Sequence, residues 1–294
     1  MSVLDEGQRQ SFEERGFAGP FELIGVPDAI ALTKSLTRAK SRMFFWNRTL
    51  SRLPVVDGWF LKARWGAAKS KLGLHAVSAD AYRLGSDPRI VARVSQVLGP
   101  DLLLCSSMLI NQRPGITHYW HHDVEATVWN GLTVWIALAN VSKQSTMRIV
   151  ARSHRLPVPP PEGLDDAAVL AEAQKHDPAC RKLDLPARPG QFYILARHLW
   201  HSSWNESARK RCALVLHYCG TDALVRFPAR PPRLPTKLIP SVPYEIPCCL
   251  VSGVNRDRKN LVVSPPRSPT APRRPPIAGT AGPPVASPVG LLEP

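Results

Sequence analysis

Apolar residues follow two different patterns along this chain, one in its first third and another in its middle. Near the N-terminus they recur every three or four positions in the segments 4–16, 29–45 and 86–99, the spacing of helices with one buried face. From residue 101 they form short continuous or alternating runs between turn-forming residues, which predicts strands. The runs are "DLLLCSSMLINQ", "LTVWIALANV", "TMRIVA", "GQFYILA" and "RCALVLHY". The two patterns together predict a mainly β protein, a sandwich or barrel, with helices before it.

Capping residues set the expected limits of the helices. Gly16 is expected to end the first helix, Asp28 to be the N-cap of the second, and Ser86 to be the N-cap of the third, which stops at Gly99. Residues 47–80 show no clear period and are expected to be irregular. A further short helix is expected within the β-rich part, in "LDDAAVLAEAQKH".

Composition divides the chain into four regions. Residues 1–100 form a helical region expected to pack on the core, and residues 101–225 form the β-rich core itself. Of the 30 prolines, 17 lie beyond residue 226, so residues 226–263 are a proline-rich extension. Residues 264–294 are predicted to be disordered, because ordering a chain costs about 1 to 2 kcal/mol per residue and this segment has little apolar surface to bury.

The net charge of +15 favours an anionic partner such as a phosphate, a carboxylate or nucleic acid, with a solvated basic face as the alternative. Ten of the basic residues lie in the stretch 34–71, which holds one acid, and no zinc-finger, RNP or KH signature accompanies them. We therefore do not expect a nucleic-acid-binding protein.

The six cysteines show no CxxC spacing, and the first residues, "MSVLDEGQRQ", are polar rather than those of a secretory signal. No apolar run approaches the roughly 20 residues that span a bilayer. These features predict a cytoplasmic protein with no membrane partner.

The segment "HYWHHDVEA", residues 118–126, contains the first candidate for chemistry. In a strand His121 and Asp123 would point to one face, with Cα atoms roughly 6 to 7 Å apart, and His122 would point to the other. His201, in "LWHSSWNES", offers a third ligand. Two imidazoles and one carboxylate with open positions suit a non-haem Fe(II) oxygenase. An HxD pair also occurs in proteins without metal, so a structural role stays open.

Arg211 lies ten residues after His201 in an extended run. Its planar guanidinium could bind a carboxylate through two hydrogen bonds. With the two histidines and the aspartate it would form a site for iron and an oxo-acid. Ser153 and His154 could suggest a hydrolase dyad, but neighbours in sequence rarely face each other.

The ordered motifs "HYWHHDVEA", "LTVWIALANVSKQSTMRIVARSHRL", "GQFYILARHLWHSSWNES" and "RCALVLHY", with the earlier "ERGFAGPF", resemble the phytanoyl-CoA dioxygenase family of Fe(II)/2-oxoglutarate oxygenases. The resemblance covers about residues 10–220. It implies a double-stranded β-helix core, also called a jelly-roll or cupin-like fold, with the metal site in the mouth of the barrel.

The resemblance also assigns roles to residues. It implies that His121, Asp123 and His201 bind the iron, that Arg211 binds the distal carboxylate of 2-oxoglutarate, and that Ser203 helps to hold it. Where the family has Gly-Ser-His, this chain has Arg152 before Ser153 and His154, so the glycine of that turn is missing. The histidines His122 and His198 are expected to lie outside the ligand set.

The implied reaction is the hydroxylation of an unactivated C–H bond of a small molecule, with Fe(II), 2-oxoglutarate and O2 as cofactor and cosubstrates and with release of succinate and CO2. Desaturation or cyclisation, a non-catalytic binding protein on the same fold, and nucleic-acid demethylation are the alternatives. The substrate, anionic or carrier-bound among the options, is left open. Candidate pocket residues are Phe44, Phe45, Trp46, Trp65, Asn111 and Met147.

Overall fold

The computed structural model describes residues 3–50, 72–123, 131–226 and 247–267. Most of the segment predicted to be irregular and all of the tail beyond residue 267 lie outside these ranges, as does Trp65. For Phe44, Phe45 and Trp46 only the helical backbone is described, so their predicted place in a substrate pocket stays a prediction.

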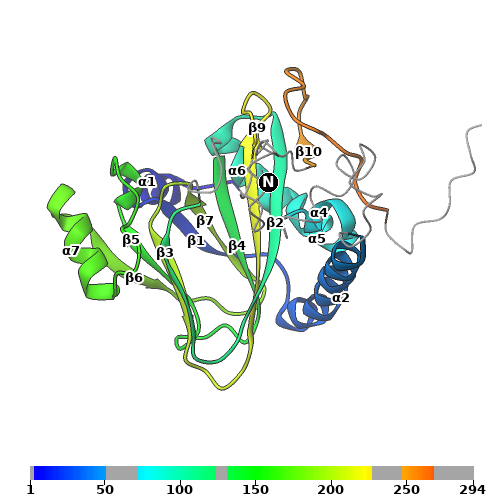
Figure 1. The fold of residues 1–294 in the computed structure, drawn as a ribbon. Helices are drawn as coiled ribbons and strands as arrows, with labels where there is room; N and C mark the ends of the chain where they lie inside the picture. Colours follow the sequence, from blue (N-terminus) through cyan, green and yellow to red (C-terminus); the bar gives the residue numbers. More distant parts are fainter. Residues whose placement is uncertain (1–2, 51–71, 124–130, 227–246, 268–294) are drawn as a thin grey trace, which may run out of the picture.

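Two antiparallel sheets form the core of the protein (Figure 1). The larger has the strand order β1-β7-β4-β9-β2-β10 and the smaller has the order β3-β8-β5-β6. The strands are β1 (Phe17–Glu22), β2 (Leu102–Gln112), β3 (Ile116–His121), β4 (Gly131–Ala139), β5 (Met147–Ala151), β6 (Arg181–Leu185), β7 (Gln191–Ala196), β8 (His201–Asn205), β9 (Arg211–Gly220) and β10 (Cys249–Ser252). This architecture confirms the predicted mainly β, jelly-roll fold with N-terminal helices.

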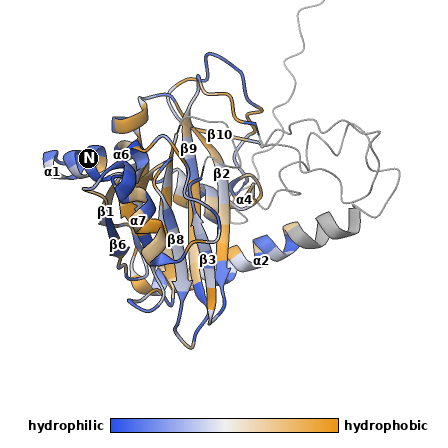
Figure 2. Ribbon diagram, turned by 60° about the vertical axis from the view of Figure 1, so that its left-hand side comes forward, coloured by the Kyte–Doolittle hydropathy of each residue, from blue (hydrophilic) through white to orange (hydrophobic). Residues whose placement is uncertain are grey.

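The helices are α1 (Glu6–Arg15), α2 (Val26–Leu50), α4 (Leu74–Val77), α5 (Ala79–Gly85), α6 (Pro88–Leu98) and α7 (Asp166–His176), with a 3₁₀ turn at Ser153–Arg155. Figure 1 shows α2, α4 and α5 on one side of the larger sheet and α7 on the far side, beyond the smaller sheet. In Figure 2 α1 is mostly hydrophilic, and it contributes no buried residue.

Two predicted helix starts and one segment expected to be irregular need correction. The second helix begins at Val26 rather than after Asp28, which lies in its first turn. The N-cap of α6 is Asp87, whose side chain accepts a hydrogen bond from the backbone N–H of Arg89, and not Ser86. The expectation that residues 47–80 are irregular is wrong for the last turn of α2, for α4 and for the start of α5. The C-cap at Gly16, with a φ of 86°, and the helix in 164–176 are as predicted.

Three edge strands, β1, β6 and β10, were not predicted, and the central strand β8, which reads "HSSWN", also lies outside the predicted apolar runs. β1 contains Gly19 and Pro20, β6 reads "RKLDL", and β10 lies in the proline-rich extension. All three lie at the edges of their sheets, where proline and charged residues are tolerated because one side of the strand needs no partner. These edge strands therefore lack the continuous apolar pattern that marked the five predicted strands.

Both faces of the larger sheet are buried. On β4, Leu132, Val134 and Ile136 pack with α2, α5 and α6 in one apolar layer, and Trp135 and Ala137 pack toward the smaller sheet in a second layer. A third layer joins α7 to the outer face of the smaller sheet through Val150 and Trp200, among others. The second layer is the interior of the barrel, in which the candidate site lies.

His75 connects the helical region, the larger sheet and the extension. Its imidazole is fully buried, with Nδ1 2.8 Å from the Ser107 hydroxyl and Nε2 2.9 Å from the carbonyl oxygen of Pro247. Burial lowers the pKa of His75 to about 4, so this side chain is neutral near pH 7. The extension is thus fixed to the core at β10 and at Pro247.

Among the described residues, no helix is both long and apolar enough to cross a membrane.

Candidate metal centre

His121, Asp123 and His201 lie together, as the sequence predicted. Their ligand atoms all fall within 4.8 Å of one another, and no other group of three or more such side chains was found in the described parts of the chain. His121 ends β3 and pairs in register with His201, which begins β8. Asp123 is not on the strand, as the alternation argument assumed, but in the turn that follows it. This turn brings the carboxylate back toward the two imidazoles.

Both histidines are oriented by backbone carbonyl groups. The Nδ1 atom of His121 lies 2.8 Å from the oxygen of Tyr119, and the Nδ1 atom of His201 lies 2.9 Å from the oxygen of Leu199. An N–H at Nδ1 satisfies these contacts, and this tautomer leaves the lone pair of Nε2 free for a metal. Burial, with the neighbouring His201, lowers the pKa of His121 to about 4, so its imidazole is neutral near pH 7.

The carboxylate of Asp123 lies among polar partners. Its Oδ1 atom is 3.7 Å from Nε2 of His201, and its Oδ2 atom is 3.5 Å from Nε2 of His217. Thr133 Oγ1 also donates a hydrogen bond to Oδ2. Burial by itself would raise the pKa of Asp123, but His201 and His217 outweigh it, and the pKa is lowered well below its usual range. The carboxylate is therefore ionised and can bind a cation.

Arg211 lies fully buried at the start of β9. Its Nη2 atom donates to the hydroxyl of Ser203 and its Nη1 atom to the carbonyl of Thr146, both at 3.2 Å, while Nε has no hydrogen-bond partner among the described residues. Burial lowers its pKa to about 10, which leaves it charged near pH 7. None of the described residues gives Arg211 a carboxylate partner, and a buried guanidinium without one is costly, so this arrangement favours an anionic ligand.

The candidate metal ligands and the residues around Arg211 line the same cavity. The three candidate metal ligands, Arg211 and Ser203 line it together with an otherwise largely apolar wall. Ser203 follows His201 by two positions on β8. The Cα atoms of two such residues are about 6 to 7 Å apart, a distance comparable to the length of a five-carbon dicarboxylate. The residues fit Fe(II) and 2-oxoglutarate in charge and spacing. The cavity has a volume of about 50 Å³, and its wall includes the flexible side chains of Met108 and Met147.

The family model described as phytanoyl-CoA dioxygenase (PhyH) matches residues 47–213. The chain belongs to the phytanoyl-CoA dioxygenase family. Members of this family are Fe(II)- and 2-oxoglutarate-dependent oxygenases, which confirms the expected class of enzyme and its cofactors, Fe(II), 2-oxoglutarate and O2. No curated protein matches the chain significantly.

Several solved structures share the fold of this phytanoyl-CoA dioxygenase family member. A non-heme monooxygenase, ThoJ in complex with Ni, is 22% identical with a TM-score of 0.56, and the match covers 89% of each chain. CytC3 with Fe(II) and alpha-ketoglutarate is 19% identical with a TM-score of 0.59, over 89% of this chain and 93% of the other. The alpha ketoglutarate dependent carbocyclase SnoK from nogalamycin biosynthesis is 19% identical with a TM-score of 0.56, over 82% and 94%.

The turn that lacks the family's glycine keeps a glycine-like backbone. Arg152 has a φ of 76° and a ψ of −12°, in the left-handed region that glycine occupies most easily. The ion pair of its Nε atom with Asp177, at 2.7 Å, accompanies this conformation. The substitution is thus accommodated without loss of the turn.

The remaining histidines near the site do not join the ligand cluster. His122 and His198 contact each other, with 3.4 Å between their Nδ1 atoms.

Ser153 and His154 do not contact each other as a hydrolase dyad would. The hydroxyl of Ser153 accepts a hydrogen bond from the backbone N–H of Trp200, and Nε2 of His154 lies 3.1 Å from the carbonyl oxygen of Glu13. The two side chains therefore have separate partners, which argues against a hydrolase dyad.

Three residues at the site were not found from the sequence: His118, Thr133 and His217. His118 lines the cavity, and its ring centroid is 4.4 Å from that of His121. Residues three apart on a regular strand face opposite sides, but a register shift between His118 and His121 lets both point inward. For Thr133 and His217, the sequence offered one signal: each is a polar residue within an otherwise apolar strand.

Two of the predicted pocket residues can be compared with the cavity. Met147 lines it, and Asn111 is not among its lining residues.

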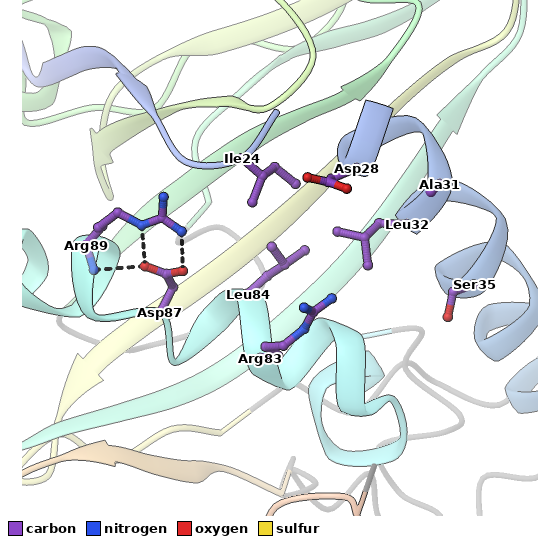
Figure 3. Close-up of a pocket in the computed structure, with 9 residues that line it drawn as sticks. All are labelled: Ile24, Asp28, Ala31, Leu32, Ser35, Arg83, Leu84, Asp87 and Arg89. Carbon is purple, nitrogen blue, oxygen red and sulfur yellow. Dashed lines mark hydrogen bonds and ion pairs between the residues drawn. The ribbon is translucent and has the colours of Figure 1, made fainter. Parts of the chain in front are cut away.

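A larger cavity of about 390 Å³ lies away from this site, between α2 and the segment that joins α5 to α6 (Figure 3). The Nη2 atom of Arg89 lies 2.7 Å from Oδ2 of Asp87, and the Nη2 atom of Arg83 lies 3.3 Å from Oδ1 of Asp80. These arginines are thus already paired, and the cavity shares no residue with the metal centre. We assign no chemistry to it.

Proposed function

We propose that this protein is an Fe(II)- and 2-oxoglutarate-dependent dioxygenase that hydroxylates an unactivated C–H bond of a small molecule. The observation that carries the proposal is a single cavity lined by His121, Asp123 and His201 and by the buried Arg211, whose Nε lacks a partner among the described residues.

Each side chain has a role in this proposal. His121, Asp123 and His201 would hold the iron through two neutral imidazoles and one carboxylate, which leaves positions for the cosubstrates. Arg211 and Ser203 would hold the distal carboxylate of 2-oxoglutarate. When bound, the iron and 2-oxoglutarate supply the activation of dioxygen, with release of succinate and CO2. The apolar wall would exclude water from the reacting centre.

The type of reaction has an alternative on the same site. Structures with this fold include proteins described as a monooxygenase, a carbocyclase and an epimerase, so the fold accommodates more than one outcome. Desaturation or cyclisation of the substrate is therefore the second candidate. A non-catalytic binding protein is disfavoured because the candidate iron ligands and Arg211 are all present. None of the six cysteines, all of which the structure describes, forms a disulfide bond, which suits a reducing compartment such as the cytoplasm.

The test is anaerobic titration with Fe(II) and then 2-oxoglutarate, followed by measurement of succinate after exposure to air. We expect one Fe(II) per chain, a weak visible absorption band that develops only with 2-oxoglutarate, and slow succinate formation without substrate. His201→Ala is the control and should show neither the band nor succinate. A tightly bound zinc with no response to 2-oxoglutarate would contradict the proposal.

Hydroxylation is tested with a library of small molecules and mass spectrometry of the products. Hydroxylation adds one oxygen atom to the substrate, and desaturation or cyclisation removes two hydrogen atoms. A product that lacks added oxygen would contradict hydroxylation and favour desaturation or cyclisation. It would not contradict the proposed iron site.

A further inference from the structure

The two oxygens of the Asp123 carboxylate face different groups. Oδ1 lies toward His201, 3.7 Å from its Nε2 atom. Oδ2 accepts the hydrogen bond from the Thr133 hydroxyl and lies 3.5 Å from Nε2 of His217. One oxygen therefore points toward the other candidate metal ligands, and the second points toward the wall of the larger sheet.

Thr133 and His217 are held firmly in that wall. They are direct partners in the register of β4 and β9, two central strands of the larger sheet. Thr133 is 2% exposed and His217 is 8% exposed. Because successive residues of a strand alternate faces, their side chains lie on the interior face, next to the turn that carries Asp123. This wall gives the carboxylate of a turn residue a fixed orientation.

We propose that Thr133 and His217 are positioning residues that hold Oδ2 of Asp123, so that the aspartate binds the metal through Oδ1 alone. The inference rests on the proposed iron site. A carboxylate free to rotate can give a metal both of its oxygens, whereas an oxygen that already accepts a hydrogen bond is a poorer ligand. Binding through one oxygen keeps a coordination position open, which a bidentate cosubstrate and dioxygen both need.

The first test compares two variants of one residue. Thr133→Val keeps the shape of the side chain but removes the hydroxyl, and Thr133→Ser keeps the hydroxyl. We expect the affinity for Fe(II), measured anaerobically without 2-oxoglutarate, to fall by about 10- to 100-fold in Thr133→Val and to change by less than about 3-fold in Thr133→Ser. The melting temperature of the metal-free protein shows whether each variant is folded.

His217→Phe is the second variant and keeps the inference testable if Thr133→Val does not fold. Its ring fills a similar space without a nitrogen near Oδ2. We expect weaker Fe(II) binding here too, by a smaller factor than in Thr133→Val, because the 3.5 Å contact is the longer of the two.

Infrared difference spectra of the metal-loaded protein, with isotope-labelled aspartate, report the binding mode directly. The separation between the two carboxylate stretching bands is wide for binding through one oxygen and narrow for binding through two. Wild type and Thr133→Ser should show the wide separation and Thr133→Val the narrow one, a change that a purely structural role of Thr133 would not produce.

The outcomes separate this inference from the proposed function. If the wild-type protein binds Fe(II) but a folded Thr133→Val binds it equally well with an unchanged spectrum, the positioning role is refuted and the iron site stands. If the wild-type protein does not bind Fe(II), the proposed function fails, and this inference fails with it.

Discussion

The two faces of β4 and β9 are equally buried but have different chemistry. Toward the helices, β9 presents Leu214, Leu216 and Tyr218 to a continuous apolar layer. Toward the smaller sheet it presents Arg211 and His217, separated by small or apolar residues. The helix-facing side is what a core requires, since each fully buried large apolar side chain contributes about 1.5 to 3 kcal/mol.

The polar residues on the interior face indicate that this face, and not the helix-facing one, has a functional role. A buried guanidinium or hydroxyl destabilises a fold unless it is paired, and Nε of Arg211 is unpaired within the described residues. Stability alone would favour an apolar residue at this position. The helix-facing side therefore holds the protein together, and we infer that the polar groups on the interior side serve to bind ligands.

The largest effect is expected from Arg211→Met, which makes the interior face as apolar as the other. The affinity for 2-oxoglutarate, measured anaerobically with Fe(II) present, should fall by about 1000-fold, or about 4 kcal/mol, because the distal carboxylate loses its charged partner. The melting temperature should stay the same or rise, since a buried charge is removed. Arg211→Lys keeps the charge without the planar fork and should give an intermediate loss. Unchanged affinity in both variants would mean that another residue binds the carboxylate.

The opposite result is expected on the helix-facing side. Leu214→Ala should lower the free energy of unfolding by about 3 kcal/mol, because it removes buried methyl groups and leaves a cavity. The affinity of the folded protein for 2-oxoglutarate should be unchanged. Denaturant unfolding and cosubstrate titration of the same sample measure the two quantities, and a parallel loss of both would show that the faces are not independent.

His75 sharpens the comparison, because it is buried and polar like Arg211 but has protein partners for both ring nitrogens. Its pKa is about 4 in the fold, from burial first, and 6.5 as the reference value for an unfolded chain. The unfolded state therefore binds more protons between these values, so stability is lost as pH falls from 6.5 toward 4. The contribution of His75 to the free energy of unfolding should fall by about 3 kcal/mol between pH 7 and pH 4.

The matched variant for this pH dependence is His75→Gln, which cannot titrate in this range. Other histidines, including His118 and His121, also have a pKa of about 4 and contribute to the same window. The contribution of His75 is therefore the difference between the two unfolding curves measured from pH 7 to pH 4. Equal slopes for wild type and variant would contradict the assignment.

The smallest effect is expected from deleting residues 268–294. Their composition offers little apolar surface to bury, so the free energy of unfolding should change by less than about 0.5 kcal/mol. Turnover of 2-oxoglutarate should also be unchanged. A marked fall in either measurement would show that this segment contacts the core.

Much of the fold could be read from local patterns. The apolar runs of β2, β4, β5, β7 and β9 marked five of the central strands, because strands buried on both faces favour continuous apolar sequence. The central strand β8 was not marked in this way, because it reads "HSSWN" and carries polar residues of the candidate site. The edge strands could not be read in this way. β10 exists because the edge of β2 accepts it, and nothing in "CLVS" specifies that partner.

The candidate site divides in the same way. The sequence by itself determined the residue types and spacing of His121, Asp123, His201 and Arg211, because metal and carboxylate binding require those chemical groups. Only the tertiary structure decided that Asp123 lies in a turn, that a register shift turns His118 inward, and that Thr133 and His217 meet at one carboxylate oxygen. The physical reason is that ligand chemistry resides in single side chains, whereas orientation depends on the register between strands that are distant in the chain and are fixed only when both faces of the sheet are packed.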